Sequence, residues 1–166
     1  MKSIFKWKNF MNRVLGAACA VLLAFMSLLT CYQVFMRYVV KNPSTISEDI
    51  LSYSFVWVSL MATALVFGER DHMNLTFFLE KMSPIVKLVL QIFSEALILL
   101  VAVVVFMFGG NKFMAVGALQ ISPTLGITMN LVYSILPVCG IMIAVYSIIN
   151  TVELVIGYKD GKEKGL

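Results

Sequence analysis

Charged residues are scarce in this sequence. They make up 13% of its 166 residues, whereas hydrophobic residues make up 60%. Soluble globular domains contain about 25% charged and about 45–50% apolar residues. The composition therefore excludes an ordinary soluble domain and indicates a protein that lies largely within a membrane.

Histidine and cysteine are also rare. His72 is the only histidine, so this chain alone cannot supply two histidine ligands to a haem. A lone histidine is more often a surface residue than a metal ligand, because a metal site needs several ligands. Cys19 and Cys31 would lie roughly 18 Å apart along one helix, and Cys139 falls in another apolar run. We expect three packing cysteines, with no disulfide, no metal site and no cofactor.

Motifs for catalysis are absent as well. The sequence contains no glycine-rich phosphate loop, no nucleophile elbow, no HExxH and no CxxC spacing. It also lacks the paired acid and base carboxylates of a hydrolytic site. We therefore do not expect an enzyme.

The sequence does contain four long apolar runs. They cover approximately residues 14–36, 50–68, 85–108 and 129–156. Each has about the 20 residues that a helix needs to cross a hydrocarbon core of roughly 30 Å. We predict an all-α polytopic membrane protein with four transmembrane helices, forming a single membrane domain over residues 1–166.

Lysine and arginine are unevenly distributed around these runs. Ten of the 13 lie before the first run, around the second connection or after the fourth run, and three lie in the other two connections. The positive-inside rule then places both termini in the cytoplasm. Residues 1–13 mix apolar and basic side chains at helical spacing, which favours a short interfacial amphipathic helix over a frayed basic tail.

Glu95 is the least expected residue in these runs. It falls near the predicted bilayer midplane and shares a helix face with Lys87 and Gln91. A carboxylate facing lipid there would be costly, so it should face protein, be protonated or be paired. A proton or cation site and a structural contact between helices are both open interpretations, and we favour the structural contact.

Several residues predict where helices begin, end or bend. Ser47 is expected to cap the second helix, with Glu48 and Asp49 near its positive end. Gly109 and Gly110 are expected to end the third helix. Pro137 should distort the fourth helix, because proline cannot donate a backbone hydrogen bond.

Trp57 lies deeper in its run than an aromatic belt requires. It is expected to fill a helix interface, either within this chain or against a partner.

The order of motifs resembles the small membrane subunit of TRAP transporters, the tripartite ATP-independent periplasmic carriers of organic acids. The motifs that carry the resemblance are Arg37-Tyr38, Pro43, Glu48-Asp49, Tyr53, Trp57, His72, Gln120, Ser122-Pro123, Leu125-Gly126, Tyr133 and Pro137. They extend over nearly the whole chain, from about residue 14 to residue 156.

The resemblance implies a non-catalytic scaffold in a sodium-coupled uptake system of the bacterial inner membrane. Its partners would be a large membrane transport subunit, a periplasmic substrate-binding protein and membrane lipids, with no nucleic acid. The substrates implied are carboxylates such as sialic acid, C4-dicarboxylates or keto acids. Residues expected at the subunit interface or in structural roles are Arg37, Tyr38, Glu48, Asp49, Trp57, His72, Gln91 and Glu95, and a periplasmic docking loop would contain Gln120, Ser122 and Pro123.

Two other functions are compatible with the residues. One is a stand-alone proton or cation channel, or a small carrier, centred on Glu95. The other is a membrane anchor for a redox enzyme, in which a partner would contribute to haem binding.

Overall fold

Helices form almost all of the described chain. The computed structural model describes residues 2–69 and 84–163. The elements in order are α1 (Lys2–Phe35), the π-helical segment η1 (Met36–Val40), α2 (Thr45–Glu69), α4 (Pro84–Val101), the π-helical segment η3 (Ala102–Gly109), α5 (Gly110–Gly117), α6 (Met129–Tyr133) and α7 (Ile135–Glu163). No strand occurs within these residues, apart from one isolated bridge between Ile121 and Thr128.

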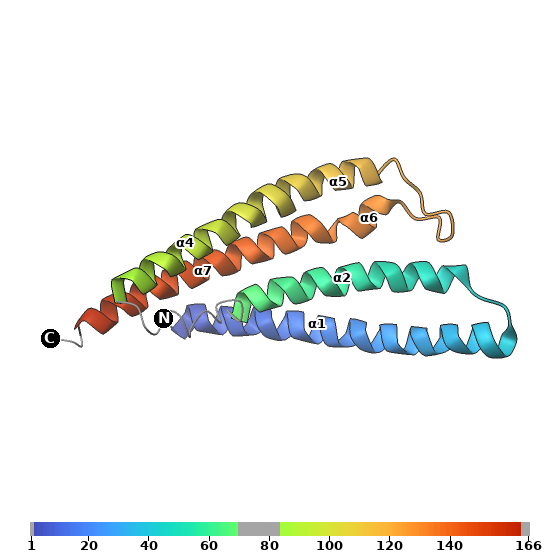
Figure 1. Ribbon diagram of the computed structural model, residues 1–166, viewed down its shortest axis with the longest axis horizontal. Coiled ribbons are helices and arrows are strands. Elements are labelled where there is room, and N and C mark those ends of the chain that lie inside the picture. Colours follow the sequence, from blue (N-terminus) through green and yellow to red (C-terminus); the bar gives the residue numbers. More distant parts are fainter. Residues whose placement is uncertain (1, 70–83, 164–166) are drawn as a thin grey trace.

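The helices form two adjacent antiparallel pairs (Figure 1). The first pair is α1 with α2, and the second is the continuous α4–η3–α5 helix with α7. α2 also packs against α7, so this contact joins the two pairs. Both chain termini lie at one end of the molecule, and the connections 41–44 and 118–128 lie at the other, which we call the loop end.

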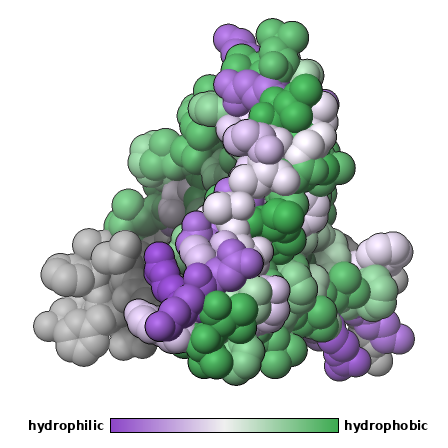
Figure 2. All heavy atoms as spheres, turned by 90° about the vertical axis from the view of Figure 1, so that its right-hand side faces the viewer, coloured by the Kyte–Doolittle hydropathy of each residue, from purple (hydrophilic) through white to green (hydrophobic). Residues whose placement is uncertain are grey.

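Four helices are long and apolar enough to cross a membrane. They cover Lys6–Val40, Thr45–Glu69, Leu88–Gly117 and Met129–Ile156. This confirms the predicted all-α fold with four transmembrane helices. Large apolar side chains such as Leu28 and Phe108 are about 70% exposed, as expected for a surface that lipid or another membrane protein covers. Figure 2, viewed from the loop end, shows how much of this surface is hydrophobic.

The N-terminal segment differs from the prediction. Residues 2–35 form one continuous helix, and no separate interfacial helix is present within them. The sequence has no proline before Pro43, so nothing forces a break between the basic segment and the first span. The sidedness of the termini stays a prediction.

Two predicted helix boundaries were wrong. Ser47 is not an N-cap, because α2 begins at Thr45 and the Ser47 hydroxyl donates a hydrogen bond to the Ser44 carbonyl at 2.8 Å. The third span does not end at Gly109 and Gly110 but continues through α5. Gly110 has ordinary helical angles, and a Cβ there would lie 3.0 Å from the Leu136 side chain. The glycine allows close packing of two helices instead of ending one.

The predicted distortion at Pro137 is present. The helix is interrupted at Ser134, between the end of α6 and the start of α7. Pro137 would clash with the carbonyl of the residue four positions earlier, Tyr133, which is where α6 ends.

Small residues let α2, η3 and α7 approach one another closely. Ala64 of α2, Ala102 of η3 and Ile143 of α7 form the buried core. Gly140 of α7 faces η3, and a Cβ added to it would lie 2.7 Å from the Phe106 Cβ. Close backbone approach through small residues is the usual way in which membrane helices associate.

We predict that Gly140→Ala destabilises the protein. The added methyl group would clash with Phe106, and overpacking of this kind typically costs about 1–3 kcal/mol. Thermal unfolding in detergent, followed by circular dichroism, would measure the change. Gly16→Ala is the matched control, because a Cβ at Gly16 meets nothing within 4 Å. Equal melting temperatures for the two variants would contradict the packing assignment.

Candidate functional site

A cluster of hydrogen bonds at the loop end joins the start of α2 to the 118–128 connection. The Ser122 hydroxyl donates to Asp49 Oδ2 at 3.2 Å, and the Thr124 hydroxyl donates to the same oxygen. Ser122 is 1% exposed, whereas Asp49 and Thr124 are half-buried, so the contact is partly shielded from water. We call Asp49, Ser122 and Thr124 the loop clamp. Asp49 thus has a specific partner beyond the favourable field of the helix N-terminus.

The backbone of the connection is also hydrogen-bonded to itself. The Ser122 N–H donates to the Ile127 carbonyl at 2.9 Å, and the Gly126 N–H donates to the Ser122 carbonyl at 2.9 Å. Gly126 has φ 65°, a left-handed conformation that glycine adopts without strain. The Met129 N–H donates to the Gln120 carbonyl and closes the loop. The 118–128 segment is therefore a closed loop that the loop clamp fixes to α2.

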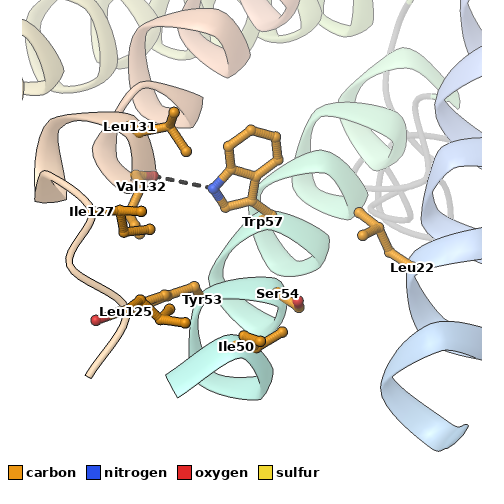
Figure 3. A pocket seen from close by; sticks show the side chains of 9 residues that line it. All are labelled: Leu22, Ile50, Tyr53, Ser54, Trp57, Leu125, Ile127, Leu131 and Val132. Atoms are coloured by element: carbon orange, nitrogen blue, oxygen red, sulfur yellow. Dashed lines mark hydrogen bonds between the residues drawn. The ribbon is translucent and has the colours of Figure 1, made fainter. Parts of the chain in front are cut away.

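Trp57 provides a second connection of α2 at the loop end, to α6 (Met129–Tyr133). Its indole N–H donates to the Val132 carbonyl at 3.2 Å, close to the interruption in the fourth span (Figure 3). Carbonyl groups at helix ends lack intrahelical donors, and Trp57 supplies one. The tryptophan therefore fills an interface within this chain, which was one of the two predicted possibilities.

A groove of about 260 Å³ lies beside Trp57. Its lining is almost entirely apolar and comes from Leu22, Ile50, Tyr53, Ser54, Trp57, Leu125, Ile127, Leu131 and Val132. These residues belong to α1, α2, the loop and α6, so the groove marks the place where the two helix pairs meet at the loop end.

A smaller groove of about 160 Å³, which we call the polar groove, lies where α1, η1 and the start of α2 meet. It is lined by Gln33, Val34, Arg37, Tyr38, Pro43, Ser44 and Glu48. Arg37 and Tyr38 are exposed on η1, and Glu48 is exposed on the first turn of α2. Within the described part of the chain, Arg37 and Glu48 form no ion pair with each other. The groove therefore presents both charges to its surroundings.

Glu95 is buried between two helices. It is 2% exposed, and the Ser147 hydroxyl of α7 lies 2.9 Å from both its carboxylate Oε2 and its backbone carbonyl. It lies seven residues after Leu88, where the apolar span begins, and this span extends to Gly117. Its predicted place near the bilayer midplane stays a prediction.

The remaining predicted residues are less constrained. Gln91 is half-buried on α4, one turn before Glu95, whereas the side chain of Lys87 lies outside the described part of the structure. His72 also lies outside the described residues. Gln120 and Pro123 of the loop have exposed side chains, unlike the buried Ser122 between them.

A polar network at the terminal end was not predicted from the sequence. Lys8 of α1 donates to Asn150 Oδ1 at 2.8 Å and pairs with Glu153 at 3.3 Å. Asn150, which is 2% exposed, donates in turn to the Phe67 carbonyl of α2 at 3.2 Å. Ser147, Asn150 and Thr151 lie within one turn of an otherwise apolar run, and this pattern could have revealed a polar face on the fourth helix.

The internal polar groups form contacts between helices and do not converge on a reacting centre. Among the described residues, no group of three histidine, cysteine, aspartate or glutamate side chains could hold a metal ion. The half-buried carboxylate of Asp49 and the buried carboxylate of Glu95 each receive hydroxyl donors from another element. The geometry at the loop end is thus suited to fixing helices and presenting a surface.

A comparison with protein families gives this architecture an identity. Residues 26–157 match the family model of the DctQ component of tripartite ATP-independent periplasmic transporters. The chain belongs to this family. The family relationship and the four apolar helices together establish a multi-pass membrane protein that is a component of a TRAP transporter, and the resemblance predicted from the motifs is confirmed.

Two relatives align with most of the chain. A Haemophilus influenzae protein, whose name describes it as a TRAP transporter small permease protein, is 25% identical over 136 residues, which are 82% of this chain and 84% of its own length. The Vibrio cholerae protein named sialic acid TRAP transporter small permease protein SiaQ is 24% identical over 153 residues, 90% of this chain and 88% of its own length. Both alignments cover nearly complete small permease subunits.

We predict that Asp49→Ala destabilises the chain, whereas Glu48→Ala does not. Both substitutions remove an acid from the start of α2, but only Asp49 accepts hydrogen bonds from Ser122 and Thr124. The loss of hydrogen bonds to a charged group is expected to cost about 1.5–3 kcal/mol. Thermal unfolding in detergent would measure the change.

A double-mutant cycle with Ser122→Ala isolates the loop clamp. The effects of Asp49→Ala and Ser122→Ala should combine to less than their sum, because each removes the same contact. Fully additive effects would show that the two side chains do not interact.

Proposed function

We propose that this chain is the non-catalytic scaffold of a sodium-coupled organic-acid uptake transporter. In this role it braces the large transport subunit within the inner membrane. The observation that carries the proposal is the use of its internal polar groups: half-buried Asp49 and buried Glu95 and Asn150 all bind other elements of the same chain. A scaffold needs such internal rigidity, because it must hold a moving partner without moving itself.

The outward surface supports the same role. Large apolar side chains are exposed along all four spans, including Phe25, Phe55, Phe93 and Ile141. Part of this surface would contact lipid and part would contact the large subunit. In hydrocarbon, two helices associate through packing and a few polar contacts, so the polar groove at the loop end is the strongest candidate for a specific subunit contact.

The polar groove has the properties of a subunit contact. Arg37 and Glu48 carry opposite charges, and Tyr38 beside them is 73% exposed. Arginine and tyrosine are enriched among the residues that dominate binding energy at protein interfaces. The groove would accept a complementary pair of polar groups from the large subunit.

The loop end would also face the periplasmic substrate-binding protein. Both termini would then lie in the cytoplasm, as the charge distribution predicts. Gln120 and Pro123 are exposed on a loop that the loop clamp fixes in position, so they would present a preformed docking surface. The substrate would be a carboxylate. Sialic acid is one candidate, because the V. cholerae relative is named for it, and C4-dicarboxylates are another.

We predict that Arg37→Ala and Glu48→Ala each weaken assembly. The yield of large subunit that co-purifies with the tagged chain should fall several-fold, because each substitution removes one charge from the polar groove. Arg13→Ala is the matched control, since Arg13 is an exposed arginine of the same helix near its other end. Undiminished co-purification in both groove variants would sink the assignment of this contact.

The alternative function, a channel centred on Glu95, makes a different prediction. Because Glu95 is buried and bonded to Ser147, the chain reconstituted alone into vesicles should conduct no ions. The ion flux of the Glu95→Gln variant should be the same as that of the unchanged chain. Fluorescence of pH-sensitive and sodium-sensitive dyes inside the vesicles would measure the flux. A flux that Glu95→Gln abolishes would favour the channel over the scaffold.

A further inference from the structure

The 118–128 loop presents apolar side chains outward at the edge of the membrane-spanning region. The third span ends at Gly117 and the fourth begins at Met129. Between them, Leu119 is 88% exposed and Ile121 is 66% exposed. Figure 2 faces this end of the molecule. Contact of two large aliphatic side chains with water is unfavourable, so we expect lipid or the apolar surface of another protein to cover them.

The loop clamp determines the direction of Ile121. Ile121 forms a β-bridge with Thr128, and successive side chains of an extended segment point to opposite sides. Its neighbour Ser122 is turned inward to Asp49, so Ile121 is turned away from the helices.

Leu119 extends the exposed apolar side of α5. Phe113 and Val116 are more than half exposed on that helix, and Leu119 follows at the same three-residue spacing. The Leu119 N–H donates to the Val116 carbonyl at 3.1 Å, which continues the helical turn into the loop. An apolar stripe therefore runs without interruption from the third span onto the loop.

The composition of the loop favours lipid over protein as the covering partner. Residues 113–128 contain no charged residue, and residues 118–128 contain no aromatic residue and no arginine. Aromatic residues and arginine dominate the binding energy of protein interfaces, whereas uncharged aliphatic side chains at a membrane boundary enter the acyl region.

We propose that Leu119 and Ile121 insert into the adjoining lipid leaflet and anchor the loop end at the membrane surface. Asp49 acts as a positioning residue, since it holds the extended loop segment in which Ile121 points toward the lipid. This anchor goes beyond the scaffold role, and it does not require a large subunit or a binding protein.

Nitroxide labelling of the full chain in phosphatidylcholine vesicles tests the proposal. Single cysteines at Leu119 and Ile121 would be introduced after Cys19, Cys31 and Cys139 are replaced by alanine. Accessibility to oxygen, which partitions into lipid, is compared with accessibility to a water-soluble nickel reagent. Phe108→Cys is the lipid reference, because Phe108 is exposed within a span, and Lys41→Cys is the aqueous reference, because Lys41 lies beyond one.

We expect the labels at 119 and 121 to match the lipid reference, with nickel accessibility several-fold below that of the Lys41→Cys label. Nickel accessibility equal to that of the Lys41→Cys label would overturn the proposal. If such aqueous labels then became protected on addition of the large subunit or the binding protein, the surface would be a protein docking site instead.

The positioning role of Asp49 has its own readout. Adding Asp49→Ala should raise the nickel accessibility at 121 several-fold and leave that of the Phe108→Cys label unchanged. An unchanged value at 121 would remove Asp49 from the anchor. Because the Phe108→Cys label in the Asp49→Ala background reports on the folded span, misfolding caused by Asp49→Ala would be recognised.

Discussion

Hydrocarbon offers no hydrogen bonds, and this constraint governs the interior of the protein. A polar side chain within a span needs a hydrogen-bond partner from the protein, since an unsatisfied polar group in lipid is costly. Some hydroxyls, such as those of Ser27 and Thr63, donate to a carbonyl of their own helix, and larger polar groups bind another element. The structure meets this requirement at three places along the bundle. The loop clamp joins α2 to the 118–128 loop, Ser147 binds Glu95 between α7 and α4, and Lys8 with Asn150 joins α1 to α7 and α2. Together these contacts tie each of the four membrane-spanning helices to at least one other.

Close packing brings these polar partners within reach. Gly140 and Ala102 allow α7 and η3 to approach until a single added methyl group would clash. Gly110 does the same beside Pro137, where the fourth span is interrupted. The interruption has a structural use as well, since it leaves the Val132 carbonyl available to Trp57. Gly110, Pro137 and Trp57 thus all contribute to helix contacts around the interruption in the fourth span.

The polar groups of the interior and those of the surface differ in their partners. The buried Glu95 carboxylate and Asn150 amide bind within the chain, while the charged side chains of the polar groove remain at the surface beside η1. The loop end therefore combines a rigid interior with a chemically varied exterior of charged, uncharged polar and aliphatic groups. In a component of a multi-subunit transporter, such an arrangement separates the contacts that maintain the fold from those available to partners.

The linear order of residues was enough to predict a membrane protein, its four membrane-spanning helices and its family. These follow from run length and from the order of motifs, which are properties of the linear chain. It misjudged Ser47, Gly110 and the N-terminal segment, because local propensity does not show whether a residue caps a helix or packs against a distant one. Three contacts could be found from the folded chain alone: Asp49 with Ser122, Trp57 with Val132, and Lys8 with Asn150. These pairs are separated by more than 70 residues, so their meeting depends on how the helices turn toward one another, which no local pattern specifies.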